Sequence, residues 1–201
     1  MGATLGNKSE EPVRCGWVSD DPLYLDYHDQ EWGVPVTNDQ KLFEMLILEG
    51  AQAGLSWITI LRKRENYRAA FADFDPQKIA AFTDQDVERL MTDAGIIRNR
   101  LKVKSVISNA KAWIEIMKGG EGAFSAFVWS VVGDKSINNT WQDLGSVPAS
   151  TVESEQLSKL FKKHGFKFVG PTICYAYMQA CGMVNDHVTD CFRHGEVKPR
   201  S

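Results

Sequence analysis

The chain has 201 residues, 43% of them hydrophobic and 24% charged, and a formal net charge of -3. This apolar content is enough for the core of one globular domain or two small ones. The acidic balance excludes nucleic-acid binding through bulk positive charge, although a local basic face stays compatible with it.

No apolar run is long enough to span a bilayer, and the first residues lack the pattern of a secretory signal peptide. We therefore expect a soluble cytoplasmic protein with no membrane partner. The four cysteines are few for a disulfide scaffold, and without a signal peptide they are expected to be thiols or metal ligands.

The first predicted helices follow a polar start. Residues 1–11 are small, polar and without periodicity, which predicts a disordered leader. The next segment, "RCGWVSDDPLYLDYHDQEWG", lies outside the helical bulk, which we expect over residues 38–182. Asn38 can cap a helix that carries "KLFEMLILEGA", and Ser56 can cap a second helix through "WITILRKRENYRAAF".

Further capping signals follow along the chain. Asp75 and Pro76 form a cap and first turn for a short third helix. Thr83 with Asp86 resembles a capping box before "VERLMTDAG", which Gly95 is expected to end. The stretch "NRLKVKSVISNAKAWIEIMKGG" carries an apolar stripe and ends in two glycines, so it predicts a longer helix.

The second half of the chain predicts shorter helices in "FSAFVWSVV" and "SEQLSKLFKKHG", with a loop, "GDKSINNTWQDLGSVPAS", between them. Alternating strand patterns are almost absent, and there are no repeats. The sequence therefore predicts an all-α fold, with a compact domain over residues 12–192 and a flexible tail over residues 193–201.

The stretch "KLFKKHGFKFVGPTICYAYMQACG" predicts two helices joined by a tight connection. Gly165 suits a left-handed C-cap, and Gly170 before Pro171 opens the next helix. Glycine at a helix start lets backbone N–H groups approach a phosphate. An ordinary connection with solvated lysines is the alternative. The lysines that would give this turn a local positive face are Lys162, Lys163 and Lys167.

Two Cys/His pairs lie near opposite ends of the chain. His187 and Cys191, four residues apart in "VNDHVTDC", would share a helix face, and Cys15 with His28 forms the second pair. Together they have the number and chemistry of a tetrahedral zinc site. Four protein ligands leave no open position, so such a zinc would serve structure and not catalysis. The alternative is a buried thiol at Cys15 and a core or helix-capping histidine at His187.

Glu49 falls on the apolar stripe of the first long helix, in register with Leu42 and Leu46. A carboxylate there is costly unless it meets a partner. Aromatic faces and one carboxylate could sandwich a flat, electron-poor base and accept a hydrogen bond from its exocyclic amine. The alternative is a glutamate that leans into solvent, with the aromatic residues in the core. Those aromatic residues are Trp17, Tyr24, Tyr27, Trp32 and Trp57.

These segments together resemble the 3-methyladenine DNA glycosylase I family of the helix–hairpin–helix DNA glycosylase superfamily. The resemblance covers about Arg14 to Cys191 and is dense in "RCGWV", "DPLYLDYHDQEWGVP", "KLFEMLILEGAQAGLSWITIL", "DAGIIRNR" and "GFKFVGPTICYAYMQACGMVNDHV". It implies a monomeric helix–hairpin–helix glycosylase fold with one structural Zn2+ per chain. This zinc clasp would join the N- and C-terminal segments through Cys15, His28, His187 and Cys191.

The resemblance also implies a reaction. A member of this family would flip a damaged nucleotide out of double-stranded DNA and release 3-methyladenine by hydrolysis, leaving an abasic site without strand cleavage. Glu49 is implied as the catalytic residue that reads the base. Trp17, Tyr27 and Trp57 are implied as the main aromatic walls, with Tyr24 and Trp32 also binding substrate. Contacts with DNA are expected at Gly54, Leu55, Lys163, Lys167, Gly170 and Thr172.

Many relatives in the superfamily carry a catalytic aspartate just beyond the second hairpin helix. Here "MVNDHV" favours Asn185 in that position, and Asp186, the next residue, is the alternative. Because N3-methylation makes adenine a cationic leaving group, we expect release of 3-methyladenine, weak action on 7-methylguanine and none on neutral lesions. Two other functions stay open: a zinc-stabilised protein that binds alkylation damage without hydrolysing it, and a zinc hydrolase with an open ligand position.

Overall fold

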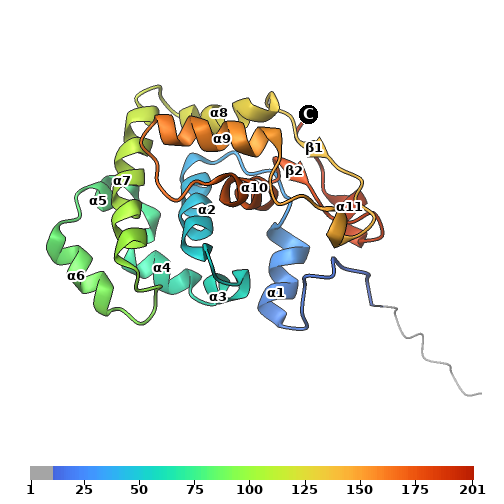
Figure 1. Ribbon diagram of the computed structural model, residues 1–201, viewed down its shortest axis with the longest axis horizontal. Coiled ribbons are helices and arrows are strands. Elements are labelled where there is room, and N and C mark those ends of the chain that lie inside the picture. Colours follow the sequence, from blue (N-terminus) through green and yellow to red (C-terminus); the bar gives the residue numbers. More distant parts are fainter. Residues whose placement is uncertain (1–10) are drawn as a thin grey trace, which may run out of the picture.

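The structure of the chain, a computed structural model, describes residues 11–201. Nearly all of the predicted leader lies outside these residues. Figure 1 shows helices packed around α2 (Asp39–Gln52), which is buried at every position from Leu42 to Ala51. The other helices are α1 (Pro22–Asp26), α3 (Trp57–Leu61), α4 (Arg64–Ala70), α5 (Pro76–Ala80), α6 (Asp84–Thr92), α7 (Arg100–Met117), α8 (Ala123–Trp129), α9 (Val152–Lys163), α10 (Pro171–Ala180) and α11 (Phe192–Glu196).

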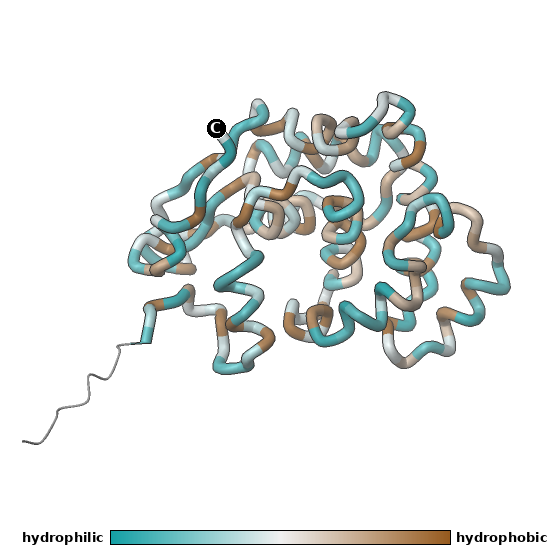
Figure 2. Tube along the Cα trace, turned by 180° about the vertical axis from the view of Figure 1, so that it is seen from behind, coloured by the Kyte–Doolittle hydropathy of each residue, from teal (hydrophilic) through white to brown (hydrophobic). Residues whose placement is uncertain are grey.

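The described residues are therefore mostly helical, which confirms the predicted class. A π-helical turn, η1 (Tyr27–Glu31), follows α1, and 3-10 turns occur at η2 (Ala72–Phe74), η3 (Ser130–Val132) and η4 (Leu144–Ser146). Figure 2 shows the hydrophobic stretches gathered in the middle of the molecule and hydrophilic ones on the outer turns. Within residues 11–201, no helix combines the length and hydropathy needed to cross a bilayer.

Several helix starts lie where the capping residues predicted them. The Asn38 carboxamide oxygen accepts a hydrogen bond from the Lys41 N–H at 2.9 Å at the start of α2. Asp75 caps α5 in the same way, and Thr83 with Asp86 forms the predicted capping box of α6. These signals are local in the chain, which is why sequence alone identified them.

The predicted second helix is divided into α3 and α4, and Ser56 does not cap it through its side chain. The Ser56 hydroxyl instead pairs with the Thr59 hydroxyl at 2.8 Å. The bend before α4 turns Arg64 into the interior, where it is 6% exposed and meets carboxylates from η1 and α2. A single straight helix was therefore the wrong prediction here.

The predicted loop after α8 contains a short strand. β1 (Ile137–Asn138) pairs in parallel with β2 (Val184–Asn185), and these are the strands labelled side by side in Figure 1. The pairing continues as the Asn139 N–H donates to the Asn185 carbonyl at 3.2 Å. Partners so distant in sequence leave no local pattern, so the sequence did not reveal them.

The last residues make contacts that a flexible tail would not make. Val197 is 6% exposed, and the Ser136 N–H donates to the Arg200 carbonyl at 3.0 Å. The Arg200 guanidinium lies 4.8 Å from the centre of the Trp129 ring. The prediction of a tail over residues 193–201 overlooked these contacts, because a short polar sequence gives no sign of its packing partners.

Candidate functional site

A cavity of about 360 Å³ lies at the centre of the candidate site. It is bounded by α1, η1 and α2 on one side and by α10 and the segment that contains η4 on the other. The structure brings together in its walls all of the residues that were expected to bind a base: Trp17, Tyr24, Tyr27, Trp32, Glu49 and Trp57.

Glu49 is buried in this cavity, with 3% of its surface exposed. Loss of hydration raises the pKa of its carboxyl group to about 8. Among the described residues, its Oε2 atom has no hydrogen-bond partner. A buried carboxyl oxygen without a partner costs free energy, so this site favours a ligand that offers a donor or a positive charge. The alternative in which Glu49 leans into solvent is wrong.

The aromatic residues form two groups around Glu49. Tyr27 packs against Trp57 with 5.3 Å between the ring centres. Trp17 packs against Tyr24 at 5.1 Å and against Trp32 at 5.0 Å. Rings held by one another keep their faces in place without a ligand, and such faces attract flat cations.

The opposite wall was not predicted from the sequence. It comes from α10 and from residues 144–149, which the sequence analysis assigned to a loop. No periodic pattern marks this segment, so no sequence signal could have placed it beside Glu49. The additional lining residues are Gln52, Leu144, Val147, Pro148, Ala149, Thr172, Tyr175, Ala176, Gln179 and Asp186.

The structure also settles which residue faces the cavity after α10. Asp186 lines it, whereas the Asn185 side chain turns to His187, with 2.9 Å between Oδ1 and Nδ1. The favoured assignment, Asn185, was therefore wrong, and the alternative, Asp186, is the residue in the cavity wall. Successive residues of an extended segment point to opposite sides, so a shift of one position exchanged the two roles.

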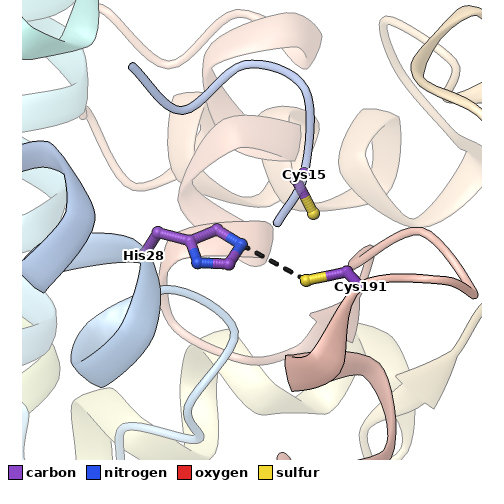
Figure 3. Close-up of side chains that lie close together, drawn as sticks. All are labelled: Cys15, His28 and Cys191. Atoms are coloured by element: carbon purple, nitrogen blue, oxygen red, sulfur yellow. Dashed lines mark hydrogen bonds between the residues drawn. The ribbon is translucent and has the colours of Figure 1, made fainter. Parts of the chain in front are cut away.

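Three of the expected metal ligands form a buried cluster. The ligand atoms of Cys15, His28 and Cys191 lie within 4.8 Å of one another. Figure 3 shows the three side chains close together. The Cys191 Sγ atom is 3.5 Å from His28 Nε2. Hydrogen bonds from the Cys15 thiol and the His28 ring lower the pKa of Cys191 to about 4. The same bond between the two cysteines raises the pKa of Cys15. A thiolate beside an imidazole nitrogen is a donor pair that suits zinc.

His187 lies beside this cluster but is not part of the three-residue group. Its ring centre is 5.1 Å from that of His28, and its buried Nε2 atom has no hydrogen-bond partner among residues 11–201. Burial lowers the pKa of His187 to about 3, so the ring is neutral. An imidazole nitrogen that has no partner among the described residues, on a ring packed against the His28 ring of the cluster, fits a fourth ligand.

Hydrogen bonds on the far side of both rings set their orientation. His28 Nδ1 is 2.7 Å from Asp29 Oδ1, and His187 Nδ1 bonds Asn185. A carboxylate or amide oxygen at Nδ1 holds the proton there and leaves the Nε2 lone pair toward the cluster. The arrangement is typical of metal-binding histidines.

The connection between α9 and α10 is held from α7. Asn109, which is 3% exposed, bonds both backbone groups of Lys167: it accepts from the N–H at 2.8 Å and donates to the carbonyl at 3.1 Å. Gly165 has a φ of +88°, as its predicted C-cap role requires. A Cβ at Gly170 would meet nothing within 4 Å, so packing inside the protein does not explain the glycine.

The remaining expected DNA contacts are divided between two places. Lys163 and Lys167 are exposed around this connection, whereas Thr172 lies in the cavity wall. Gly54, with a φ of +80°, and Leu55, 41% exposed, follow the end of α2. Along the chain, Leu55 lies between Gln52 and Trp57, which both line the cavity.

Comparisons with known proteins give a consistent result. Residues 17–194 match the family model described as methyladenine glycosylase. The chain is 58% identical to DNA-3-methyladenine glycosylase 1 of Escherichia coli (strain K12), over 92% of this chain and 99% of that protein. A crystal structure of 3-methyladenine DNA glycosylase I superposes with a TM-score of 0.88 at 58% identity, covering 90% of this chain and 98% of the other.

A second solved structure carries a ligand. It is a variant of 3-methyladenine DNA glycosylase I in complex with 3-methyladenine, and it superposes with a TM-score of 0.87 at 37% identity. The match covers 94% of this chain and 99% of the other.

Proposed function

The chain belongs to the methyladenine glycosylase family and is a DNA glycosylase, and from this we propose that it excises 3-methyladenine from alkylated double-stranded DNA. The lesion leaves as the free base, and the strand keeps an abasic site. The observation that carries the proposal is Glu49, a buried carboxyl group in an aromatic cavity, whose Oε2 atom has no hydrogen-bond partner within residues 11–201. The relatives named above, one of them bound to 3-methyladenine, support the same substrate.

Binding of the base follows from the charge of the lesion. A 3-methyladenine nucleotide is cationic and must leave the base stack to reach the cavity. The faces of the aromatic residues attract the cation, and the positive charge favours the ionised form of Glu49 although burial opposes it. The carboxylate then accepts a hydrogen bond from the exocyclic amine of adenine.

Cleavage of the glycosidic bond needs little further catalysis, because the cationic base is already a good leaving group. The bond between the base and sugar C1′ breaks, and both electrons stay with the base, which leaves neutral. Water adds to C1′ and loses a proton to solvent. Of the described residues that line the cavity, none is a lysine, so the site offers no side-chain amine for a Schiff base and strand cleavage. The enzyme is proposed to be monofunctional.

The same chemistry limits the range of substrates. A neutral lesion such as hypoxanthine needs a positioned acid, and proton transfer by such a group contributes roughly 10²–10⁴-fold. Asn185 turns away from the cavity, and both Asp186 oxygens are occupied by donors. Guanine presents a carbonyl acceptor where adenine presents an amine, so 7-methylguanine is expected to react weakly. Hypoxanthine is expected not to react.

We also propose that Cys15, His28, His187 and Cys191 hold one Zn²⁺. The donor set and the buried Nε2 of His187 support this assignment. Four protein ligands leave no position for water, so the ion would cross-link the two ends of the chain and take no part in the reaction. A zinc hydrolase, which requires an open position, is not favoured.

The DNA-binding face is proposed to combine the α9–α10 connection with Gly54 and Leu55. Backbone N–H groups at Gly170 would bind a phosphate, and Lys163 and Lys167 would add charge. Leu55 would fill the space that the flipped nucleotide leaves in the stack.

The test is a base-release assay on methylated and on deaminated duplex DNA, with the released bases separated by chromatography. The wild-type protein should release 3-methyladenine and no hypoxanthine. Glu49→Gln should bind free 3-methyladenine more weakly by about 1.5–3 kcal/mol, the usual contribution of a hydrogen bond to a charged group. The exposed Glu121→Gln serves as a matched control.

The outcomes separate the alternatives. Binding of alkylated DNA without release of any base would identify a damage-binding protein and contradict the proposal. Unchanged base affinity in Glu49→Gln would show that another group reads the base. Hypoxanthine release at a rate near that of 3-methyladenine would mean that the site contains an effective acid.

A further inference from the structure

Asp186 has an unusual set of partners for a carboxylate in a cavity wall. It is 1% exposed and accepts four hydrogen bonds. On Oδ1 the donors are Asn139 Nδ2 at 2.7 Å and Trp141 Nε1 at 2.8 Å; on Oδ2 they are the Tyr175 hydroxyl at 2.5 Å and Gln179 Nε2 at 2.8 Å.

These bonds leave Asp186 no capacity for chemistry. A carboxylate has about four acceptor sites on its two oxygens, and all of them are used here. To take a proton from water, Asp186 would have to lose one of its donors. A direct role as base or nucleophile therefore does not fit this geometry.

The four donors belong to two different parts of the fold. Asn139 and Trp141 follow β1 and precede the segment 142–149, whereas Tyr175 and Gln179 lie on α10. We propose that Asp186 is a positioning residue that ties segment 142–149 to α10 and thereby fixes the width of the base cavity. This inference rests on the proposed function, since it concerns the cavity that holds the base.

Segment 142–149 needs such an anchor. Leu144, Val147 and Pro148 line the cavity from this segment. Among the described residues, the hydrogen bonds of 142–149 all stay within residues 140–147, for example from the Ser146 N–H to Asp143. The segment therefore takes its position from its two ends and from side-chain packing.

Side-chain packing places segment 142–149 next to the aromatic group that contains Trp17. A Cβ added at Gly16 would lie 3.4 Å from Leu144 Cδ1, so Leu144 sits directly above the residue that precedes Trp17. The Trp141 carbonyl also accepts from the Thr189 N–H at 2.9 Å. The hydrogen bond from the Trp141 indole to Asp186 is thus the last side-chain bond to Asp186 before segment 142–149 begins.

Trp141→Phe tests the proposal because it removes one N–H donor and keeps most of the ring. A hydrogen bond to a charged group corresponds to roughly tenfold or more in an equilibrium constant. We expect about tenfold weaker binding of free 3-methyladenine and a similar rise in KM on methylated DNA. The single-turnover release rate at saturating enzyme should stay within about twofold, because bond cleavage does not use this contact. The exposed Glu121→Gln, outside this segment, is the control.

A double-mutant cycle provides the readout that a general loss of packing would not produce. If Trp141 acts through Asp186, adding Trp141→Phe to Asp186→Ala, which removes every acceptor at this position, should cost no further base affinity. Additive losses would overturn the proposal, as would normal base affinity in Trp141→Phe. A lower single-turnover release rate in Asp186→Asn, with unchanged base affinity, would show that Asp186 takes a direct part in the reaction. This result would also overturn the proposal. If Asp186→Ala does not fold, Trp141→Phe alone decides. A wild-type protein that neither binds nor releases 3-methyladenine would contradict the proposed function instead.

Discussion

Trp32 lies edge-on to His187, with 4.5 Å between the ring centres, and also lines the cavity that contains Glu49. Trp17 makes a similar link, since its ring centre is 5.3 Å from that of His28. The proposed zinc ligands therefore support two of the aromatic walls directly. Loss of the cluster should disturb base binding as well as stability.

His187→Ala should lower the melting temperature and also weaken binding of free 3-methyladenine, because Trp32 loses the ring it packs against. Structural zinc contributes on the order of 10–16 kcal/mol of apparent binding free energy in small peptides. A domain with a large core of its own should depend on it less. Differential scanning calorimetry measures the melting temperature, base titration measures the affinity, and elemental analysis measures the zinc content. The exposed His164→Ala is the control, and a purified wild-type chain without zinc would contradict the assignment.

Glu49 should make stability depend on pH in a defined direction. Its pKa is about 8 in the folded protein and near 4.3 in an unfolded chain. Between these values the folded state keeps a proton that the unfolded state has lost, so the free energy of unfolding falls as pH rises. Relative to that of Glu49→Gln, the free energy of unfolding of the wild type should fall by about 1.4 kcal/mol for each pH unit across this window. Urea unfolding of both proteins at several pH values tests this, and parallel curves would show that Glu49 is already ionised.

Gly170→Val should reduce DNA affinity and leave the affinity for the free base nearly normal. The glycine has a φ of -65° and open space at its Cβ position, so the fold should accept valine, whereas a phosphate close to the backbone should not. Fluorescence anisotropy with methylated duplex measures the first affinity, and calorimetric titration with 3-methyladenine the second. Equal loss of both would mean that the connection is not a separate DNA contact.

Lys163→Ala should act through charge alone. One fewer released counterion should reduce the salt dependence of DNA binding by about one unit of slope. The control is Lys135→Ala, on the exposed turn before β1. The same slope in Lys163→Ala and wild type would remove Lys163 from the DNA-binding face.

Arg64→Leu should be strongly destabilising because it breaks a buried charge network. Burial raises the pKa of Glu44, but the hydrogen bond from Arg64 and the charge of Lys41 more than offset this and hold it below its usual value. Removal of one partner of a buried pair costs about 3–5 kcal/mol. Arg68 also bonds Glu44 at 2.7 Å, so the loss in the free energy of unfolding should be near the lower end of this range. Arg89→Leu, in an exposed pair with Asp86, should cost less than about 1 kcal/mol by chemical denaturation.

A second variant keeps this prediction distinct from simple loss of packing. Glu44→Gln combined with Arg64→Leu removes the charge that the single variant leaves buried. The double variant should therefore be more stable than the sum of the single changes predicts. Strict additivity would show that the two side chains do not interact.

How far the sequence predicted this structure depended on the range of the interactions. The caps at Asn38 and Asp75 were identified because the bonds that they make reach only two or three residues along the chain. Glu49 was identified because a carboxylate interrupts an apolar stripe with a helical period. The aromatic residues that line the same cavity come from neighbouring segments.

The contacts that escaped prediction join distant segments. Asn109 bonds Lys167 from another helix, and Trp141 reaches Asp186 through a parallel strand pair. Neither leaves a periodic signal in the chain. The exchange of Asn185 and Asp186 has a similar origin, because which of two adjacent residues faces the cavity is decided by strand pairing with β1.

The meeting of the two ends of the chain also affects how the protein is made. The Val13 carbonyl accepts from the Phe192 N–H, and Cys15 meets Cys191 in one cluster. Because a ribosome adds residues in one direction, the helices around α2 can pack long before Cys191 has been synthesised. Until then Trp17 and Trp32 lack their support. A nascent chain that stalls after α10 would therefore contain the apolar core and the connection proposed to contact DNA, yet its base cavity would be incomplete.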